Sequence, residues 1–316
     1  MKQFLSIKDI SSLSSLLTEA AEVKKAPFAW KTLGTNKTMC LLFLNPSLRT
    51  RLSSQRAAFN LGIEAMVLDI GTQGWKLEFG DGVVMSGDKA EHIKEAAAVI
   101  GSYFDMVAIR AFAELNDKDL DYSEQILTAF TKYCPVPVIN MESGTGHPLQ
   151  AFADLITIED HKKIERPKVV LTWAPHPKAL PQAVANSFAE WTCAANYEVV
   201  ITHPTGYELD EQFTQGATIE YDQNKAFEDA DFIYAKNWCS FTEYGKILST
   251  DPNWMVSSEK MSRTNGGKFL HCLPVRRNMI VEDSVLDSKN SLVIEQAANR
   301  VVSMQTILKN ILEKIE

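Results

Sequence analysis

Two arginines and two hydroxyl side chains follow a short apolar run early in the chain. The stretch FLNPSLRTR, from Phe43 to Arg51, places Ser47, Arg49 and Thr50 at the expected start of a helix. The first N–H groups of a helix have no partner within it, and a guanidinium can donate two parallel hydrogen bonds to one anion. These groups could converge on a phosphate, although Ser47 as an ordinary helix cap beside solvated arginines explains the stretch equally well.

Two further segments place polar residues directly after apolar runs. Arg110 closes the run DMVAI, where its guanidinium either caps carbonyl groups and pairs with an acid or reaches into a site. HPLQ, from His147 to Gln150, follows Glu142 and SGTG at a strand-to-helix turn, and its Pro148 suits the first turn of an ordinary helix. An imidazole and an amide one turn apart can also polarise a carbonyl oxygen and hold an amide group.

Two late segments complete the set of polar residues. HCLP, from His271 to Pro274, contains Cys272, which is more often a core residue than a nucleophile in such a setting. No arrangement of His and Asp that would activate the thiol is readable. Arg300 begins the final helical pattern, where a solvated arginine is the simpler interpretation.

Several cofactor and metal motifs are missing from the sequence. No G-x-G-x-x-G follows an expected strand and no G-x-x-x-x-G-K-[ST] occurs, which disfavours dinucleotide and P-loop sites. The histidines lack the spacing of H-E-x-x-H, and the 5 cysteines form no C-x-x-C pair. We therefore expect no metal, no cofactor and no disulfide framework, which fits a reducing compartment.

Composition and charge exclude other classes of partner. The 316 residues are 45% hydrophobic, with a net charge of -8 and a pI near 5.4. Such a surface repels nucleic acid and anionic membranes, so an anion has to be bound by a local cluster of positive groups. No window reaches the roughly 18 apolar residues of a membrane span, and the N-terminus lacks a signal-peptide pattern. We expect a soluble, cytoplasmic protein.

Alternating apolar runs and helical patterns predict an α/β fold with two open parallel sheets. In the first half, the expected strands lie at 38–45, 64–70, 105–112 and 136–143. The expected helices of this half lie at 7–21, 46–62, 88–103 and 121–134. In open α/β sheets, ligands bind beyond the carboxyl ends of the strands, and the polar segments fall at such ends.

A long amphipathic pattern at 147–163 is the expected connection to a second domain. The expected strands of this second half lie at 169–175, 198–204, 218–222, 231–238 and 268–274. Its expected helices lie at 181–196, 223–230 and 251–261. A last amphipathic helix at 296–316 could join either domain by periodicity alone.

Taken together, the polar segments resemble the transcarbamylase family, whose members transfer a carbamoyl group from carbamoyl phosphate to an amine. The order S-x-R-T, Arg, H-P-x-Q, H-C-L-P and a late Arg spans residues 47 to 300, nearly the whole chain. The resemblance implies a carbamoyl-phosphate-binding domain over 1–146, with helix 296–316 packing back on it, and an acceptor-binding domain over 164–295. The implied carbamoyl phosphate ligands are Ser47, Leu48, Arg49, Thr50, Trp75, Arg110, His147, Gln150, Cys272, Leu273 and Arg300.

The resemblance also implies the chemistry. A neutral amine attacks the carbonyl carbon, and hydrogen-bond donors and cations hold the tetrahedral oxyanion until phosphate leaves. Because carbamoyl phosphate is already activated, no covalent enzyme intermediate is needed. His147 would bind the carbonyl oxygen, Gln150 the amide, and Arg110 both phosphate and carbonyl. The implied catalytic residues are Arg49, Thr50, Arg110, His147, Cys272 and Arg300.

Two features of assembly and topology follow from the same resemblance. It implies a homotrimer with shared active sites, in which Trp75 of GTQGWKLE reaches the carbamoyl phosphate of the neighbouring subunit. It also implies a deep knot, in which the chain near Lys236 to Asp251 passes through the loop 174–184. Such threading is a rare exception among folds.

The acceptor site resembles one branch of the family. Ordinary ornithine transcarbamylases have an aspartate after the strand that matches 231–238 and a later S-M-G motif, whereas this chain has Lys236 and no S-M-G. A cation suits an added carboxylate or acyl oxygen and repels a free ammonium, so the resemblance implies an N-acyl-L-ornithine as acceptor. The matching acyl-ornithine contacts are Glu142, His176, Lys178, Lys236, Arg276 and Ala90.

Ala90 and Ile280 bear on the acyl group. N-acetyl enzymes of this branch carry a glutamate and a lysine at these positions, whereas the N-succinyl enzymes lack both. A glutamate at position 90 would repel a succinyl carboxylate, so Ala90 favours N-succinyl-L-ornithine, in arginine biosynthesis. Lys178 favours the alternative acceptor, N-acetyl-L-ornithine, because lysine lacks the bidentate fork of the arginine that the succinyl type has there.

Two alternatives come from other functional classes. A non-catalytic homologue that binds the same ligands would not need the full set of oxyanion donors. A nicotinamide-dependent oxidoreductase would need the glycine motif that is missing. Carbamoyl transfer is therefore the expected activity.

Overall fold

The computed structural model describes residues 1–315, and for residues 72 and 73 only the backbone. The chain forms two compact units, each with its own parallel sheet. Unit 1 comprises Met1–Glu114, Asp119–Leu149 and Arg300–Glu316. Unit 2 comprises Leu115–Lys118 and Gln150–Asn299.

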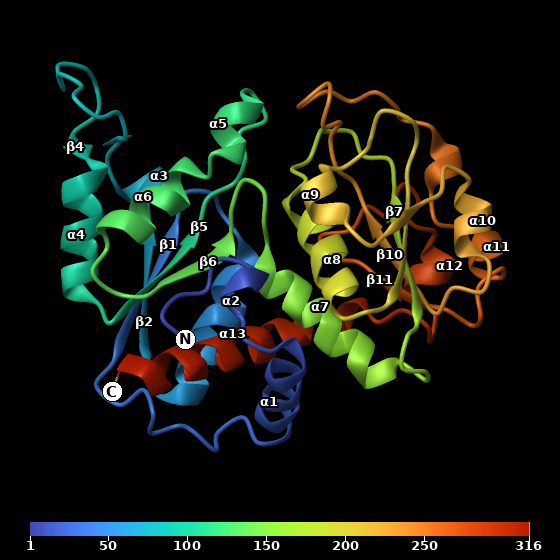
Figure 1. Cartoon of the computed structure of the whole chain (residues 1–316), viewed down its shortest axis with the longest axis horizontal. Coiled ribbons are helices and arrows are strands. Elements are labelled where there is room, and N and C mark those ends of the chain that lie inside the picture. The colour runs from blue at the N-terminus through green and yellow to red at the C-terminus, as the bar shows by residue number, and fades with distance from the viewer. Residues whose placement is uncertain (316) are drawn as a thin grey trace. The chain divides into compact units, whose positions relative to one another are not determined.

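Unit 1 contains a four-stranded sheet of order β2-β1-β5-β6 (Figure 1). Its strands are β1 (Thr38–Phe43), β2 (Glu64–Asp69), β5 (Met106–Arg110) and β6 (Val138–Glu142), and all pair in parallel. β5 and β6 are buried along their full length, and β1 in all but its first residue. A sheet covered on both faces explains these continuous apolar runs, and the four strands predicted in the first half are confirmed.

The helix that follows β1 is α2 (Leu48–Leu61), and both of its ends are determined locally. Ser47 caps it by accepting a hydrogen bond from the backbone N–H of Thr50. Gly62 ends it with a φ of 82°, and a Cβ at this position would lie 2.2 Å from the carbonyl oxygen of Lys31. Glycine is therefore required for both reasons.

Three predicted helices of unit 1 differ from the structure. The pattern at 7–21 forms a short turn and a helix, η1 (Ile7–Asp9) and α1 (Leu13–Lys25). The pattern at 121–134 is likewise divided into α5 (Lys118–Tyr122) and α6 (Gln125–Tyr133). The pattern at 88–103 is helical only from α4 (Ile93–Tyr103), because β4 (Glu91–His92) pairs with β3 (Leu77–Glu78). A short helix, α3 (Ile70–Gln73), follows β2.

Unit 2 contains a five-stranded sheet of order β11-β10-β7-β8-β9. Its strands are β7 (Lys168–Trp173), β8 (Glu198–Thr202), β9 (Thr218–Ile219), β10 (Phe232–Lys236) and β11 (Lys268–Leu270). All pair in parallel, so the five strands predicted in the second half are confirmed. The central strands β7 and β10 are buried almost throughout.

The helices of unit 2 are mostly short. They are α8 (Ala183–Ala194), α9 (Glu211–Thr214), α10 (Gln223–Phe227), α11 (Ser258–Met261) and α12 (Asp283–Leu286). The single helix predicted at 251–261 is wrong, because two turns form there, η2 (Pro252–Trp254) and α11. Asp251 caps the first and Ser257 the second, so each begins with its own hydrogen bond to a side chain.

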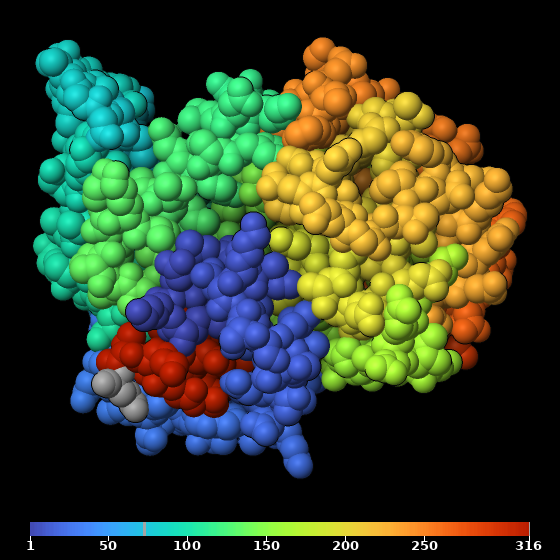
Figure 2. All heavy atoms as spheres, in the orientation of Figure 1, coloured from blue at the N-terminus to red at the C-terminus, as the bar shows by residue number. Residues whose placement is uncertain are grey.

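Two continuous helices carry the chain from one unit to the other. They are α7 (Pro148–His161), divided after Leu149, and α13 (Val293–Ile315), divided after Asn299. Figure 2 shows the first residues of the chain beside the end of α13, where the amino group of Met1 donates a 2.7 Å hydrogen bond to Asn310 O. Within residues 1–315, no helix has both the length and the apolar character needed to cross a bilayer.

The strand order determines where each unit can bind a ligand. In unit 1, β1 lies between β2, which follows it in the chain, and β5, which comes later and pairs with its other edge. In unit 2, β7 lies in the same way between β8 and β10. At such reversals the connections diverge and leave a crevice beyond the carboxyl ends of the strands. The predicted polar segments SLRT, HPLQ and HCLP follow β1, β6 and β11, and Arg110 ends β5.

Candidate active site

The amino end of α2 forms the first part of the site in unit 1. Thr50 N donates a 3.2 Å hydrogen bond to Ser47 Oγ, so the predicted helix cap is present. Arg49 is half-buried, and its Nε has no hydrogen-bond partner among the residues that the structure describes. The Leu48 side chain is 71% exposed and has no polar group, so only the backbone N–H of this residue could bind an anion. The turn thus combines helix N–H groups, a hydroxyl and a guanidinium.

Arg300 reaches the same turn from α13. Its Nη2 donates a 2.6 Å hydrogen bond to Thr50 Oγ1, and both side chains are buried. Two further contacts bind α13 to unit 1: Ser303 Oγ donates to Leu149 O over 2.7 Å, and Asn60 Nδ2 donates to Gln305 Oε1 over 2.8 Å. A permanent positive charge therefore lies against the amino end of α2.

Arg110, at the carboxyl end of β5, is held on three sides. Its Nη1 donates 2.9 Å hydrogen bonds to Asn45 O and Pro46 O, and its guanidinium lies 3.9 Å from the centre of the Phe112 ring. Its Nη2 is 3.1 Å from Glu142 Oε2. Burial lowers the pKa of Arg110, and the charge of Glu142 opposes this shift. An arginine stays protonated under such conditions, so the pair is a buried ion pair.

His147 follows β6 and is 3% exposed. Burial lowers its pKa well below 6.5, and the charges of Arg300 and Arg110 lower it further. The imidazole is therefore neutral near pH 7, and its contact with Glu142, 3.5 Å between Nε2 and Oε2, is not an ion pair. A neutral imidazole can donate one N–H to a carbonyl oxygen without bringing a competing charge.

Glu124 holds the turn that presents His147, and sequence reasoning missed it. Its carboxylate accepts hydrogen bonds from Thr145 N at 2.7 Å, Gly144 N at 3.1 Å and Ser143 Oγ at 2.8 Å. The contacts join residues about twenty positions apart and carry no local pattern, so no sequence signal could have identified Glu124. The charged side chain fixes the loop between β6 and α7.

His176 and Arg276 lie together in unit 2. Arg276 Nε donates a 3.0 Å hydrogen bond to His176 Nε2, which must therefore be unprotonated. The ring proton then sits on Nδ1, which donates to Lys178 O at 2.9 Å. Burial lowers the pKa of His176, and the charges of Arg276, Lys236 and Lys178 act in the same direction.

Lys236 ends β10 beside this group and is 8% exposed. Its Nζ donates a 2.9 Å hydrogen bond to Asn237 O, and Asn237 Nδ2 donates to Ala174 O at 2.8 Å. Lys178 is exposed. The region around His176 is thus rich in cations, which suits a ligand with carboxylate or acyl oxygens.

The HCLP turn of unit 2 holds Cys272 and Leu273. Leu273 has a φ of 55°, and its N–H donates to His271 Nδ1 at 2.8 Å. Because this nitrogen is engaged, it cannot take a proton from the Cys272 thiol. Burial raises the pKa of the adjacent Tyr234 well above 10, and Asp154 and Cys272 contribute in the same direction. The turn offers contacts rather than an activated nucleophile.

Trp75 and Ala90 lie on an exposed part of unit 1. Trp75 is 60% exposed, its Nε1 donates to Glu91 Oε2 at 2.9 Å, and it lines a groove of about 450 Å³ with Leu68 and Tyr103. Ala90 ends an exposed stretch that begins at residue 81. The structure thus places both residues on a surface available to another molecule.

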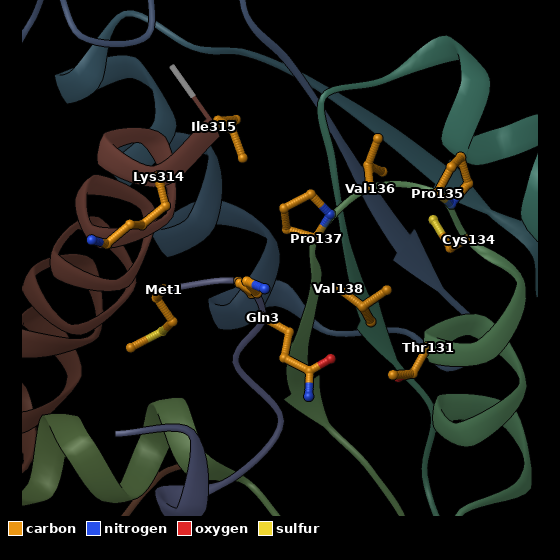
Figure 3. A pocket seen from close by; sticks show the side chains of 11 residues that line it. Met1, Gln3, Thr131, Cys134, Pro135, Val136, Pro137, Val138, Lys314 and Ile315 are labelled. Atoms are coloured by element: carbon orange, nitrogen blue, oxygen red, sulfur yellow. The ribbon is translucent and has the colours of Figure 1, made fainter. Parts of the chain in front are cut away.

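A second cavity of unit 1, of about 290 Å³, lies away from the residues above. Figure 3 shows Met1, Gln3, Val138 and Ile315 around it. Val138 begins β6, so this cavity is at the amino end of the strand, whereas His147 follows the carboxyl end. It is therefore not the candidate site.

Two domains of one known enzyme family match the two halves of the chain. The aspartate/ornithine carbamoyltransferase carbamoyl-P binding domain matches residues 2–160, and the Asp/Orn binding domain of the same enzymes matches residues 181–311. The chain is 57% identical to the N-succinylornithine carbamoyltransferase of Bacteroides thetaiotaomicron over 318 residues, which cover 100% of both chains. It is 39% identical to the N-acetylornithine carbamoyltransferase of Xanthomonas campestris pv. campestris, over 98% of this chain and 97% of the relative.

A solved structure shows the same fold. It is an N-acetyl-L-ornithine transcarbamylase variant complexed with carbamyl phosphate and N-succinyl-L-norvaline. The two chains are 37% identical and superpose with a TM-score of 0.93, over 98% of this chain and 100% of the other. The chain therefore belongs to the aspartate/ornithine carbamoyltransferase family.

Proposed function

We propose that the enzyme transfers the carbamoyl group of carbamoyl phosphate to the δ-amine of N-succinyl-L-ornithine. The products would be N-succinyl-L-citrulline and phosphate, and we place the reaction in arginine biosynthesis. The observation that carries the choice of acceptor is the full-length identity of 57% with an N-succinylornithine carbamoyltransferase, against 39% with an N-acetylornithine enzyme. Ala90, which brings no carboxylate to repel a succinyl group, supports the same choice.

We assign carbamoyl phosphate to the cluster of Arg49, Arg110 and Arg300 in unit 1. Ser47, Arg49 and the N–H groups at the start of α2 would bind the phosphate, and Arg110 would bridge phosphate and carbonyl. The burial of Thr50, Arg110, His147 and Arg300 supports this role, because donors in a low dielectric stabilise an oxyanion strongly. Gln150, Cys272 and Leu273 are assigned to the carbamoyl group.

In this mechanism the neutral δ-amine attacks the carbonyl carbon. The C–N bond forms, the negative charge on the carbonyl oxygen is held by cations and by the neutral imidazole of His147, and the C–O bond to phosphate breaks. The departing phosphate takes up the proton that the amine loses. Positioning and electrostatic stabilisation supply the catalysis, since no residue has to form a covalent intermediate.

We assign the acyl-ornithine to unit 2, with Glu142 of unit 1 as a further contact. Arg276, which is hydrogen-bonded to His176, and Lys236 would supply positive charge for the α-carboxylate and the acyl oxygens of the acyl-ornithine. Lys178 would meet the terminal carboxylate of the succinyl group. A single lysine makes a weaker contact than a bidentate arginine, which keeps N-acetyl-L-ornithine as the alternative acceptor.

The test is formation of the citrulline derivative from carbamoyl phosphate with three acceptors in parallel: N-succinylornithine, N-acetylornithine and ornithine. Highest kcat/KM with the succinyl compound supports the proposal. Preference for the acetyl compound would mean that Lys178 outweighs Ala90, and preference for free ornithine would contradict the assignment of Lys236. No release of phosphate with any acceptor would favour a non-catalytic homologue.

We further propose a homotrimer with shared sites. Unit 1 exposes two apolar patches: the α2 patch, formed by Leu48, Leu52 and Phe59, and the α4 patch, formed by Trp75, Val99 and Tyr103. A cyclic trimer is built from one heterologous contact repeated around an axis, so it needs two different surfaces on each subunit. Trp75 in the α4 patch would then approach the carbamoyl phosphate of a neighbour.

The proposed knot is supported by contacts of the loop 174–184. Cys239 N donates to Leu180 O at 2.8 Å, and Gln182 Nε2 donates to Cys239 O at 3.0 Å. The segment expected to thread the loop thus packs tightly against it. An experimental density map that traces the chain through residues 236–251 tests whether the segment passes inside the loop.

A further inference from the structure

Asp154 lies on α7, one turn after Gln150, and is 0% exposed. Its Oδ1 accepts two hydrogen bonds of 2.7 Å, one from Gln150 Nε2 and one from Gln296 Nε2. Hydrogen bonds to a carboxylate are charge-assisted, and burial strengthens them because little water competes. One carboxylate oxygen therefore holds two side-chain amides.

The contact with Asp154 determines which way the Gln150 amide is turned. A carboxylate only accepts hydrogen bonds, so the amide must direct its NH₂ group toward Asp154. Its carbonyl oxygen is then directed away from Asp154, and this buried Oε1 has no hydrogen-bond partner among the described residues. A buried acceptor without a partner is unusual and marks a place where a donor of a ligand can bind.

The second amide extends the same arrangement to the HCLP turn. Gln296 directs its NH₂ group toward Asp154, and its Oε1 accepts a 2.9 Å hydrogen bond from His271 N. His271 in turn accepts the N–H of Leu273 on Nδ1. Asp154 is thus connected through Gln296 to the turn that carries Cys272.

Resting on the proposed function, we propose that Asp154 is a positioning residue that selects a donor substrate with an NH₂ group on its reacting carbonyl. By holding the NH₂ group of Gln150, it leaves Gln150 Oε1 as an acceptor for the NH₂ group of carbamoyl phosphate. Acetyl phosphate has the same phosphate and carbonyl but a methyl group in place of that NH₂. If the Gln150 amide were turned the other way, two NH₂ groups would face each other, and the advantage of carbamoyl phosphate would disappear.

The test measures the dissociation constants of carbamoyl phosphate and acetyl phosphate for the full-length chain by calorimetry. The wild type should prefer carbamoyl phosphate by at least about tenfold, because acetyl phosphate leaves Gln150 Oε1 unpaired. The substitution Asp154→Leu introduces a side chain of similar size that has no hydrogen-bond acceptor. It should reduce the preference for carbamoyl phosphate over acetyl phosphate by about fivefold or more. It should leave binding of acetyl phosphate within about twofold. A purely structural role would weaken both ligands equally, and an unchanged ratio would overturn the proposal.

A second variant decides the question if Asp154→Leu does not fold. Gln150→Glu combined with Asp154→Asn exchanges the acid and the amide. The new amide can donate to the new carboxylate and still accept from Gln296, which leaves one carboxylate oxygen for the ligand. Preference for carbamoyl phosphate should return to within about threefold of the wild type, whereas Gln150→Met, which presents no acceptor to the ligand, should lose it. If the double variant prefers carbamoyl phosphate over acetyl phosphate no more strongly than the single variant does, the proposal is overturned.

The outcomes separate this inference from the proposed function. A wild type that forms no citrulline derivative with any acceptor contradicts the proposed function. A wild type that is active, with the same ligand preference in all variants, contradicts only the role of Asp154.

Discussion

The guanidinium of Arg300 donates a 2.6 Å hydrogen bond to the hydroxyl of Thr50, although 250 positions separate the two residues. Both side chains are buried, so the contact is little weakened by water. It joins the last helix of the chain to the turn that we assign to the phosphate. The charge of Arg300 also contributes to the lowered pKa of His147.

Arg300→Ala should lower kcat/KM for carbamoyl phosphate by about 10- to 150-fold. This range corresponds to losing one charge-assisted contact of about 1.5–3 kcal/mol. Steady-state kinetics at saturating acceptor measure the effect. Thr50→Ser keeps the hydroxyl and serves as the control, which should stay within about threefold of the wild type. An Arg300→Ala enzyme as active as the control would contradict the assignment.

Arg49→Ala and Arg51→Ala form a matched pair on α2. Both remove one positive charge, but only Arg49 lies in the proposed phosphate turn, whereas Arg51 is exposed. We expect Arg49→Ala to reduce kcat/KM by about tenfold or more and Arg51→Ala by less than about twofold. Equal losses would mean that the overall charge of the surface, rather than a direct contact, governs binding.

The lowered pKa of His147 predicts a loss of stability at acid pH. Because its native pKa is below 6.5, the unfolded chain binds a proton that the native chain does not. Stability therefore falls as pH falls below 6.5 toward the native pKa, by at most about 1.4 kcal/mol per pH unit from this group. The free energy of unfolding can be measured with urea near pH 7.5 and near pH 5.5. Its decrease between these two pH values should be about 1 kcal/mol larger for the wild type than for His147→Gln. The same pH dependence in both proteins would argue against a buried, neutral His147.

Ala90→Glu should change the choice of acceptor. A carboxylate at this position would repel the succinyl carboxylate by about 1–4 kcal/mol, which corresponds to roughly 5-fold or more in kcat/KM. Activity with N-acetylornithine should change less. Ala90→Gln has similar size without charge and controls for sterics. If the charged and neutral variants lose succinyl activity equally, Ala90 does not act through charge.

Single charges in the two apolar patches should disrupt the proposed trimer. Leu52→Glu in the α2 patch and Tyr103→Glu in the α4 patch each damage one side of a heterologous contact. Each variant alone should be a monomer in sedimentation velocity. An equimolar mixture should form dimers, because each variant still has the surface that the other needs. Monomers in the mixture, or trimers of either variant, would contradict this arrangement.

Local residues determined which elements could be predicted from the sequence. Ser47 and Gly62 mark both ends of α2, and buried parallel strands read as continuous apolar runs, so these elements were predicted. The helix at 88–103 was wrong at its start because Glu91 and His92 pair with residues that precede them by fourteen positions. Pairing with a distant strand overrides a local helical preference.

The candidate site was predicted by residue type but not by its contacts. The resemblance identified Arg110 and Glu142, yet assigned them to different substrates, whereas the structure joins them in one ion pair. Asp154 had a local signal, since an acid four positions after Gln150 on a helix can contact it, but sequence reasoning missed it. The hydrogen bonds of Glu124 had no such signal. The roles of all these residues in catalysis stay predictions.

The division of unit 1 into segments from both ends of the chain affects how a nascent polypeptide can acquire structure. Translation completes every segment of unit 2 before it reaches Arg300, so the unit that begins first is finished last. Domains usually fold in the order in which they leave the ribosome, and here that order is reversed for the final step. A prematurely terminated chain would lack Arg300 and the rest of α13, and so could not complete the unit that we assign to the phosphate.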